Sequence, residues 1–227
     1  DFLKEMKFSS NPKFWNDPAI VTEFRDLKPP PYWTVFFSRL RKQGQRKVLD
    51  LGCGGGRNTQ LLAELGFNFW ACDLSEMMLK VTRQRLSTFL SHREIKRRVV
   101  KASILVLPFR SRFFNTVLSN GVYHNVRSVD ELAATIAETA RVLKEGGLLA
   151  VNLFYRGGLH GDLRLDKRGT DLFYNKQGVS MVLLQKNKLL VMFRQQGFVP
   201  IGGLKTYETD ISTGKRSVLR GVFKKAR

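Results

Sequence analysis

The stretch from Val48 to Thr59 constrains the fold of this chain more than any other. Four apolar or acidic residues at positions 48–51 have strand composition, glycines follow at positions 52, 54 and 56, and helix-forming residues begin at once. Glycines allow a backbone to turn sharply and to approach a ligand closely. The amide groups at the start of the next helix favour an anionic group. The stretch therefore predicts a ligand-binding strand–loop–helix unit.

The rest of the chain alternates strands with helices. Strands are expected at 48–51, 67–72, 98–102, 116–119 and 148–154, and helices at 58–65, 75–90, 129–143 and 187–196. Such alternation predicts a parallel sheet with helices on both faces. Two further strands, at 198–206 and 217–224, are joined by a short turn at Thr213-Gly214. A connection this short forces the last strand to run antiparallel to its predecessor.

We expect residues 1–227 to form one domain, since this length fits a single α/β unit. Residues 1–44 hold several prolines, and between them the segments 19–27 and 32–42 have apolar residues at helical spacing, which predicts a helical N-terminal extension. Residues 155–186 are basic and loop-rich, with a hairpin expected around Asn175–Gly178. We interpret this segment as a variable insertion that shapes an acceptor site.

The details of the glycine loop discriminate between ligands. A dinucleotide fingerprint starting at Gly52 would place its third glycine at position 57, which is Arg57. A P-loop would need Gly-Lys-Ser/Thr, which is absent from the loop. The loop combines an acid, Asp50, with backbone amides and a cation, Arg57. This combination suits a ligand that has both an ammonium and a carboxylate. Asp73 lies 21 residues after Gly52, where a carboxylate can accept both hydroxyls of a ribose; the alternative is that it only caps the next helix, although Ser75 can do so instead.

The spacing Asp50-x-Gly52-x-Gly54-x-Gly56 resembles motif I of the class I S-adenosylmethionine-dependent methyltransferases. Segments 107–109, 113–117 and 141–147 resemble later motifs of that family, so the resemblance covers roughly residues 47–154, about half of the chain. The loop ending Gly56-Arg57-Asn58 is similar to the type 11 and tellurite-resistance-type members. The resemblance implies a Rossmann-like α/β fold with a mostly parallel seven-stranded sheet and an antiparallel last strand.

The resemblance also implies that S-adenosylmethionine is the cofactor. Its binding residues would then come from the glycine loop and from the ends of the neighbouring strands: Asp50, Gly52, Cys53, Gly54, Gly56, Arg57, Asn58, Asp73, Leu74, Ser103, Ile104 and Asn120. Two positions depart from the family pattern. Ser103 stands where an acid usually binds the adenine amino group, and Asn115 replaces another common acid. We expect adenine recognition to be rearranged accordingly.

Methyl transfer from a sulfonium is a direct displacement in which the protein mainly positions the reactants. A general base is needed only if the acceptor must lose a proton. His124 and Tyr123, which follow the fourth strand, are the candidates we place first, ahead of Tyr155 and His160. The alternative for His124 is a hydrogen-bonded loop histidine. Two cysteines and three histidines form no metal-ligand pattern, so no metal is expected.

The net charge of +20 favours anionic partners. We expect a small, anionic acceptor attracted by basic residues of the insertion: Arg156, Arg164, Lys167 and Arg168. Trp15 or Tyr32 would close over the cofactor as a lid; the alternative is that these aromatic residues pack in the core. Alternatives are an RNA or DNA methyltransferase, a fold relative that cyclises or cleaves the cofactor, or a basic surface with no special partner. With neither a bilayer-spanning run nor a signal-peptide pattern, we expect a cytoplasmic protein without membrane contact, and no oligomeric state is indicated.

Overall fold

The computed structural model describes residues 11–44, 47–158 and 160–226, so the first ten residues of the expected extension lie outside it. A seven-stranded sheet forms its centre, in the order β3-β2-β1-β4-β5-β10-β9. The strands are β1 (Lys47–Leu51), β2 (Asn68–Asp73), β3 (Val99–Lys101), β4 (Phe114–Asn120), β5 (Leu143–Phe154), β9 (Phe198–Ile211) and β10 (Gly214–Lys225). Strand β10 runs antiparallel to both of its neighbours, and the other pairings are parallel. The predicted sheet and its antiparallel last strand are confirmed.

The strand order reverses between β1 and β4. From β1 the chain moves outward to β2 and β3, then returns across β1 to form β4. The connections that follow β1 and β4 therefore leave the sheet in opposite directions, and a gap opens between their carboxyl ends. This reversal places the glycine loop, which follows β1, next to the segment after Asn120.

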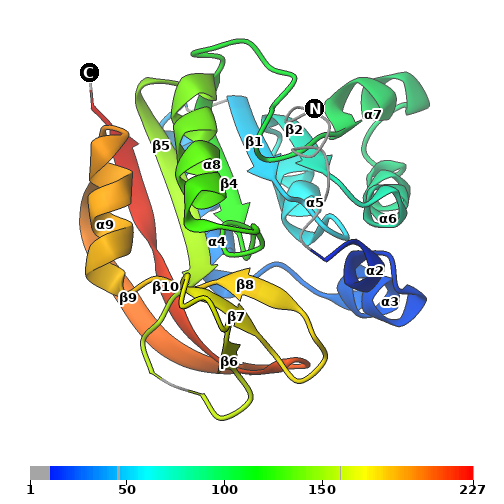
Figure 1. Cartoon of the computed structure of the whole chain (residues 1–227). Helices are drawn as coiled ribbons and strands as arrows, with labels where there is room; N and C mark the ends of the chain where they lie inside the picture. Colours follow the sequence, from blue (N-terminus) through cyan, green and yellow to red (C-terminus); the bar gives the residue numbers. More distant parts are fainter. Residues whose placement is uncertain (1–10, 45–46, 159, 227) are drawn as a thin grey trace.

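Helices cover both faces of the sheet (Figure 1). They are α2 (Pro12–Trp15), α3 (Pro18–Asp26), α4 (Pro31–Lys42), α5 (Arg57–Glu64), α6 (Glu76–Leu86), α7 (His92–Arg98), α8 (Val129–Val142) and α9 (Lys186–Gln195). None of the helices in the described ranges is long and apolar enough to cross a bilayer.

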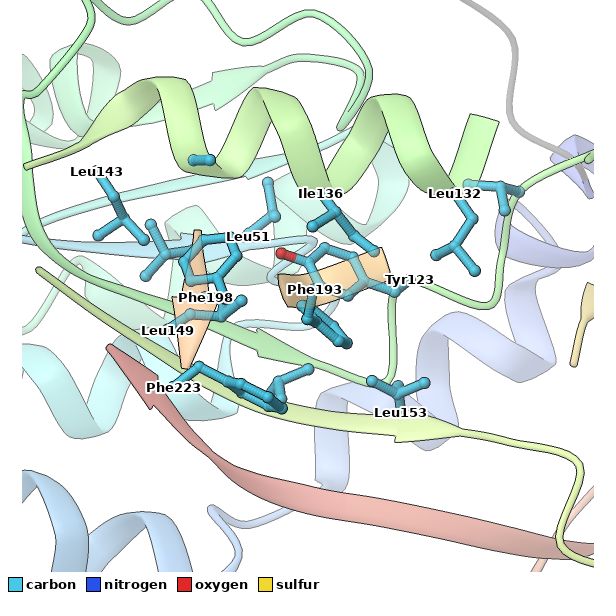
Figure 2. Packing of buried hydrophobic residues seen from close by; sticks show 14 of the residues in the cluster. Leu51, Tyr123, Leu132, Ile136, Leu143, Leu149, Leu153, Phe193, Phe198 and Phe223 are labelled. Atoms are coloured by element: carbon cyan, nitrogen blue, oxygen red, sulfur yellow. The ribbon is translucent and has the colours of Figure 1, made fainter. Parts of the chain in front are cut away.

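Alternate residues of each strand pack on opposite faces, as a two-residue period requires. Val117 and Leu149 join the cluster beneath α8 and α9, whereas Leu118 and Ala150 join the cluster beneath α4 and α5. Figure 2 shows the first cluster, in which Phe193 of α9 lies among the side chains of the sheet. Both faces of the central strands are therefore buried, whereas the edge strand β9 is mostly exposed.

The helix predicted at 75–90 is wrong in its length. Helix α6 ends at Leu86, before the predicted end at residue 90, and a further helix that was not predicted, α7, begins at His92. Ser91 caps α7 by accepting a hydrogen bond from the Glu94 amide, and the Glu94 carboxylate accepts one from the Ser91 amide. This capping box fixes a new helix start inside a stretch of continuous helical composition.

The insertion at 155–186 is more ordered than the sequence indicates. It contains a three-stranded antiparallel sheet of β6 (Arg164–Leu165), β7 (Leu172–Tyr174) and β8 (Ser180–Val182). The hairpin predicted around Asn175–Gly178 is confirmed, and it joins β7 to β8. The side-chain oxygen of Asn175 stabilises the turn by accepting hydrogen bonds from the amides of Gln177 and Val179. Sequence composition alone did not predict these strands because each is only two or three residues long.

Helix α3 lies directly on the glycine loop. A Cβ atom added to Gly55 would lie 2.6 Å from the carbonyl oxygen of Phe24, which belongs to α3. Backbone atoms cannot move aside as a flexible side chain can. Only glycine, which has a hydrogen atom in place of a side chain, therefore fits at this position. Gly55 is therefore the residue that lets the N-terminal extension pack against the loop.

Replacing Gly55 by Ala should push α3 away from the loop and lower the free energy of unfolding by about 1–3 kcal/mol. Chemical denaturation measures this change, and limited proteolysis reports whether the extension is released. Gly203→Ala is the matched control, because a Cβ there would meet nothing within 4 Å. Equal stability of the two variants would contradict the contact.

Candidate functional site

The glycine loop leaves β1 and becomes the N-terminus of α5. Gly56 is the N-cap residue of α5, with φ of 79° in the left-handed region. A Cβ at this position would also lie 2.7 Å from the hydroxyl oxygen of Thr82 in α6. The loop can hold this shape only with glycine at position 56.

Asp73 ends β2 and faces the glycine loop. Its carboxylate accepts one hydrogen bond from the Gly54 amide and one from the Ser75 amide, each at 2.9 Å. A carboxylate offers about four acceptor positions, so about two remain for a ligand. Burial raises the pKa of the Asp73 carboxyl, while the backbone hydrogen bonds act in the opposite direction. Ser75 itself caps α6 through its hydroxyl, as expected.

A cavity lies at the carboxyl ends of β1, β2 and β4. It brings together seven of the twelve residues predicted to bind a cofactor: Gly52, Gly54, Asp73, Leu74, Ser103, Ile104 and Asn120. Its wall also includes the apolar or aromatic side chains of Trp15, Phe24, Met78, Leu105 and Val126, of which only Trp15 had been considered from the sequence. Tyr32, the other lid candidate, is not among the described residues that line this cavity.

The remaining predicted residues lie behind the loop or beside the cavity. The Asp50 carboxylate is buried, and it accepts a hydrogen bond of 2.6 Å from the Thr59 hydroxyl of α5. Burial is the main reason why the pKa of Asp50 rises to about 7. Asn58 and Cys53 are buried too, and the Cys53 amide donates to the Cys72 carbonyl of β2. These positions, together with Gly56, support the loop from behind.

The two departures from the family pattern lie in different places. Ser103 lines the cavity, and its hydroxyl oxygen accepts a hydrogen bond from the Leu105 amide. Asn115 lies near the start of β4, where its side-chain oxygen accepts from the Lys47 amide of β1. Asn115 thus joins the amino ends of two strands, at the end of the sheet away from the cavity.

A second cavity adjoins the first and has a volume of about 630 Å³, within the rough range of 300–1,000 Å³ for small-molecule sites. The two cavities share five residues: Trp15, Phe24, Asn120, Gly121 and Asn125. The second is closed by side chains from α3 and α4, from the ends of β4, β5 and β10, and from the β9–β10 hairpin. Asn120 is held at the boundary because its side-chain oxygen accepts a hydrogen bond of 2.7 Å from the Trp33 indole.

The insertion contributes less to this cavity than expected. Val179 and Met181 are its only described residues in the lining. The four predicted cations are elsewhere: Arg156 pairs with Asp171, Arg168 pairs with Asp166, and neither Arg164 nor Lys167 lines the cavity. Arg57 and Arg220 are the arginines in the lining, among the described residues.

Sequence reasoning missed Arg220 altogether. The available signal was its position in β10, where it interrupts the otherwise apolar run Val218-Leu219 to Val222-Phe223. A cation inside a central strand needs a reason, since such strands are normally apolar on both faces. The register that places Arg220 beside Asn152 of β5 could not be read from sequence.

His124 lines the second cavity but is almost fully buried. Its Nδ1 accepts a hydrogen bond of 3.1 Å from the Phe154 amide, and its ring stacks on that of Phe154. Burial, with a smaller contribution from the charge of Arg216, lowers the pKa of His124 to about 3. An Nδ1 that accepts leaves the ring proton on Nε2, so a neutral His124 donates rather than accepts at its free nitrogen.

Tyr123 lies in the core beneath α8 (Figure 2). Its hydroxyl donates to the Thr139 hydroxyl, and burial raises its pKa. Among the described residues that line the two cavities, neither Tyr123, Tyr155 nor His160 is present. His160 instead lies 3.0 Å from the Ser217 hydroxyl. The geometry therefore gives no exposed general base among the candidates.

Comparisons with known proteins show which family and which fold the chain resembles. Residues 49–151 match the family model described as a methyltransferase domain. The demethylmenaquinone methyltransferase of Corynebacterium urealyticum is 36% identical over 108 residues, which is 48% of this chain and 41% of that protein. The ubiquinone biosynthesis O-methyltransferase of Thiobacillus denitrificans is 30% identical over 148 residues, 65% of this chain and 60% of that protein. The chain thus aligns with about half the length of the curated relatives it matches.

A solved structure shares the fold. The 1,6-didemethyltoxoflavin-N1-methyltransferase of Burkholderia thailandensis, solved with its substrate and S-adenosylhomocysteine, superimposes with a TM-score of 0.62 at 20% identity. The likeness covers 87% of this chain and 77% of that one. Residues 49–151 thus match the methyltransferase-domain family, and the solved structure shows that the fold is that of a class I methyltransferase. Domains of this family use S-adenosylmethionine as the methyl donor, which agrees with the predicted cofactor.

Replacing Asp73 by Ala should weaken the binding of S-adenosylhomocysteine to this methyltransferase domain by about tenfold to a hundredfold. A hydrogen bond to a charged group contributes about 1.5–3 kcal/mol, and the variant loses the acceptor that we predict for the ribose. Isothermal titration calorimetry measures the change. Asp26→Ala, at an exposed carboxylate outside both cavities, serves as the control. An unchanged affinity in Asp73→Ala would remove that residue from the cofactor site.

His124 should make the methyltransferase domain sensitive to acid. Its pKa is near 6.5 in the unfolded chain and about 3 in the folded one, so the unfolded chain binds more protons between these values. The neutral ring therefore contributes to the free energy of unfolding above pH 6.5, and this contribution is lost as the pH falls toward 3.

Between pH 7.5 and 4.5, the wild type should therefore lose about 2–3 kcal/mol more free energy of unfolding than His124→Gln. Denaturant unfolding at both pH values measures the difference. Equal losses in the two proteins would show that His124 is not buried in its neutral form.

Proposed function

We propose that this chain transfers a methyl group from S-adenosylmethionine to a small organic acceptor bound in the second cavity. The observation that carries the proposal is the shared wall of the two cavities at Asn120 and Gly121. A donor in one cavity and an acceptor in the other would meet at this wall, as a direct displacement requires.

The cofactor would lie along the carboxyl ends of the strands. Its ribose hydroxyls would bind the free acceptor positions of Asp73, and its adenine would lie beside Ser103 and Ile104. The methionine end would lie on the glycine loop, where Gly52 and Gly54 line the cavity. The sulfonium would then face Asn120 and direct its methyl group toward the second cavity. Aromatic faces such as that of Trp15 stabilise a cation of this kind.

The chemistry that remains for the protein is positioning and exclusion of water. S-adenosylmethionine supplies a reactive methyl group, and correct placement alone can lower a barrier by roughly 7–11 kcal/mol. We assign His124 a positioning role, in which Nε2 donates a hydrogen bond to the acceptor. An acceptor whose nucleophilic atom is already deprotonated, or is acidic, needs no base from His124.

A small acceptor fits the second cavity better than a polynucleotide does. Its lining is closed on several sides by aromatic side chains, including Trp33, Phe14 and Tyr207. A flat ring system would stack well on such walls. Two relatives are a demethylmenaquinone methyltransferase and a ubiquinone biosynthesis O-methyltransferase, which supports an aromatic acceptor for this chain as well. The net charge of +20 supports an acceptor with an anionic group.

The proposal predicts the product of a labelling experiment. The purified chain is incubated with methyl-labelled S-adenosylmethionine and either a small-metabolite extract or total RNA. We expect label in the metabolite fraction, together with S-adenosylhomocysteine in equal amount, and about a tenfold or greater loss of label with Asp73→Ala. Label in RNA alone would contradict the small acceptor. Methylthioadenosine without S-adenosylhomocysteine would contradict methyl transfer itself.

A further inference from the structure

Arg220 has a position that the proposed cofactor site does not require. It lies in the middle of β10, paired with Asn152 of β5 on one side and with Lys205 of β9 on the other. Its side chain lines the second cavity, and it does not line the first. A function for Arg220 must therefore concern the acceptor.

Two tyrosine rings, one from α4 and one from β9, contact the guanidinium of Arg220. Its Cζ lies 4.3 Å from the ring centre of Tyr32 in α4 and 4.8 Å from that of Tyr207 in β9. The Tyr207 hydroxyl is fixed in turn, since it donates to the side-chain oxygen of Asn152 at 3.2 Å. Stacking on aromatic faces orients the planar fork of an arginine while leaving its edge donors free.

No carboxylate neutralises Arg220 within the described part of the chain. None of the ion pairs found there includes it, and its buried Nε has no hydrogen-bond partner. Arg216, four residues earlier in β10, shows the contrast, because Asp162 pairs with it at 2.7 Å. The acids that line the second cavity, Glu23 and Asp210, are both exposed. A half-buried cation that lines a cavity and has no counter-ion among the described residues is suited to an anion that arrives with the ligand.

We propose that Arg220 binds a carboxylate of the acceptor, and this inference rests on the proposed function. The planar guanidinium would donate two parallel hydrogen bonds to the two carboxylate oxygens. The ring that bears the carboxylate would lie among the aromatic side chains of the cavity, with its reacting atom toward Asn120. Arg220 thereby sets the substrate class as aromatic carboxylic acids and selects against their neutral analogues.

The test compares acids with matched neutral amides. Hydroxybenzoic and hydroxynaphthoic acids, and the carboxamide of each, are titrated into the chain saturated with S-adenosylhomocysteine. We expect the wild type to bind at least one acid about tenfold or more tightly than its amide, since a hydrogen-bonded ion pair is lost with the amide. In Arg220→Met this preference should fall to about one.

Three further measurements test whether the preference for acids over amides depends on the guanidinium of Arg220. Arg220→Lys, which keeps the charge but loses the fork, should restore only part of the preference. Arg97→Met, at an exposed arginine outside both cavities, should retain all of it. Binding of S-adenosylhomocysteine should be the same in all four proteins, which shows that each variant is folded.

The inference is overturned if no acid binds the wild type, if acids and amides bind equally, or if Arg220→Met keeps the preference. Failure of the proposed function gives a different result. A chain that binds the acids through Arg220 but transfers no methyl group to any of them or to a metabolite extract contradicts methyl transfer and leaves the anion site intact.

Discussion

The hydrogen bond from the Gly54 amide to the Asp73 carboxylate is the interaction on which the candidate site depends. It joins the loop after β1 to the end of β2, so two segments that are separate in sequence form one wall. Asp50 fixes the same loop from behind through Thr59. With these two contacts in place, Gly52, Gly54 and Asp73 line one cavity, an arrangement that suits an adenosyl amino acid.

The reversal of strand order between β1 and β4 provides the space, and the N-terminal extension closes it. Helix α3 packs on Gly55. In α4, the Trp33 indole donates a hydrogen bond to the Asn120 side chain at the boundary of the two cavities. The extension is therefore part of the site and not an appendage. Strand β10 lies between β5 and β9, and its Arg220 lines the second cavity.

Local signals in the sequence were sufficient to predict most of the fold and seven of the residues that line the first cavity. Glycine spacing, strand alternation and the acid at Asp73 are all short-range patterns with a direct physical cause. Long-range contacts account for what the sequence could not predict. The break between α6 and α7 depends on a capping box inside a helical stretch, and the acceptor wall depends on how β10 and its hairpin pair with β5. Burial, which no local pattern reports, changed the expected role of His124 from a base to a neutral donor and placed Tyr123 in the core.

A crystal structure of the chain with S-adenosylhomocysteine tests the central claim most directly. The account predicts the ribose hydroxyls on the Asp73 carboxylate, the adenine beside Ser103, and the sulfur at the Asn120 boundary, open to the second cavity. Ligand bound elsewhere, or ligand bound in this cavity with its ribose hydroxyls too far from the Asp73 carboxylate to form hydrogen bonds, would contradict the account.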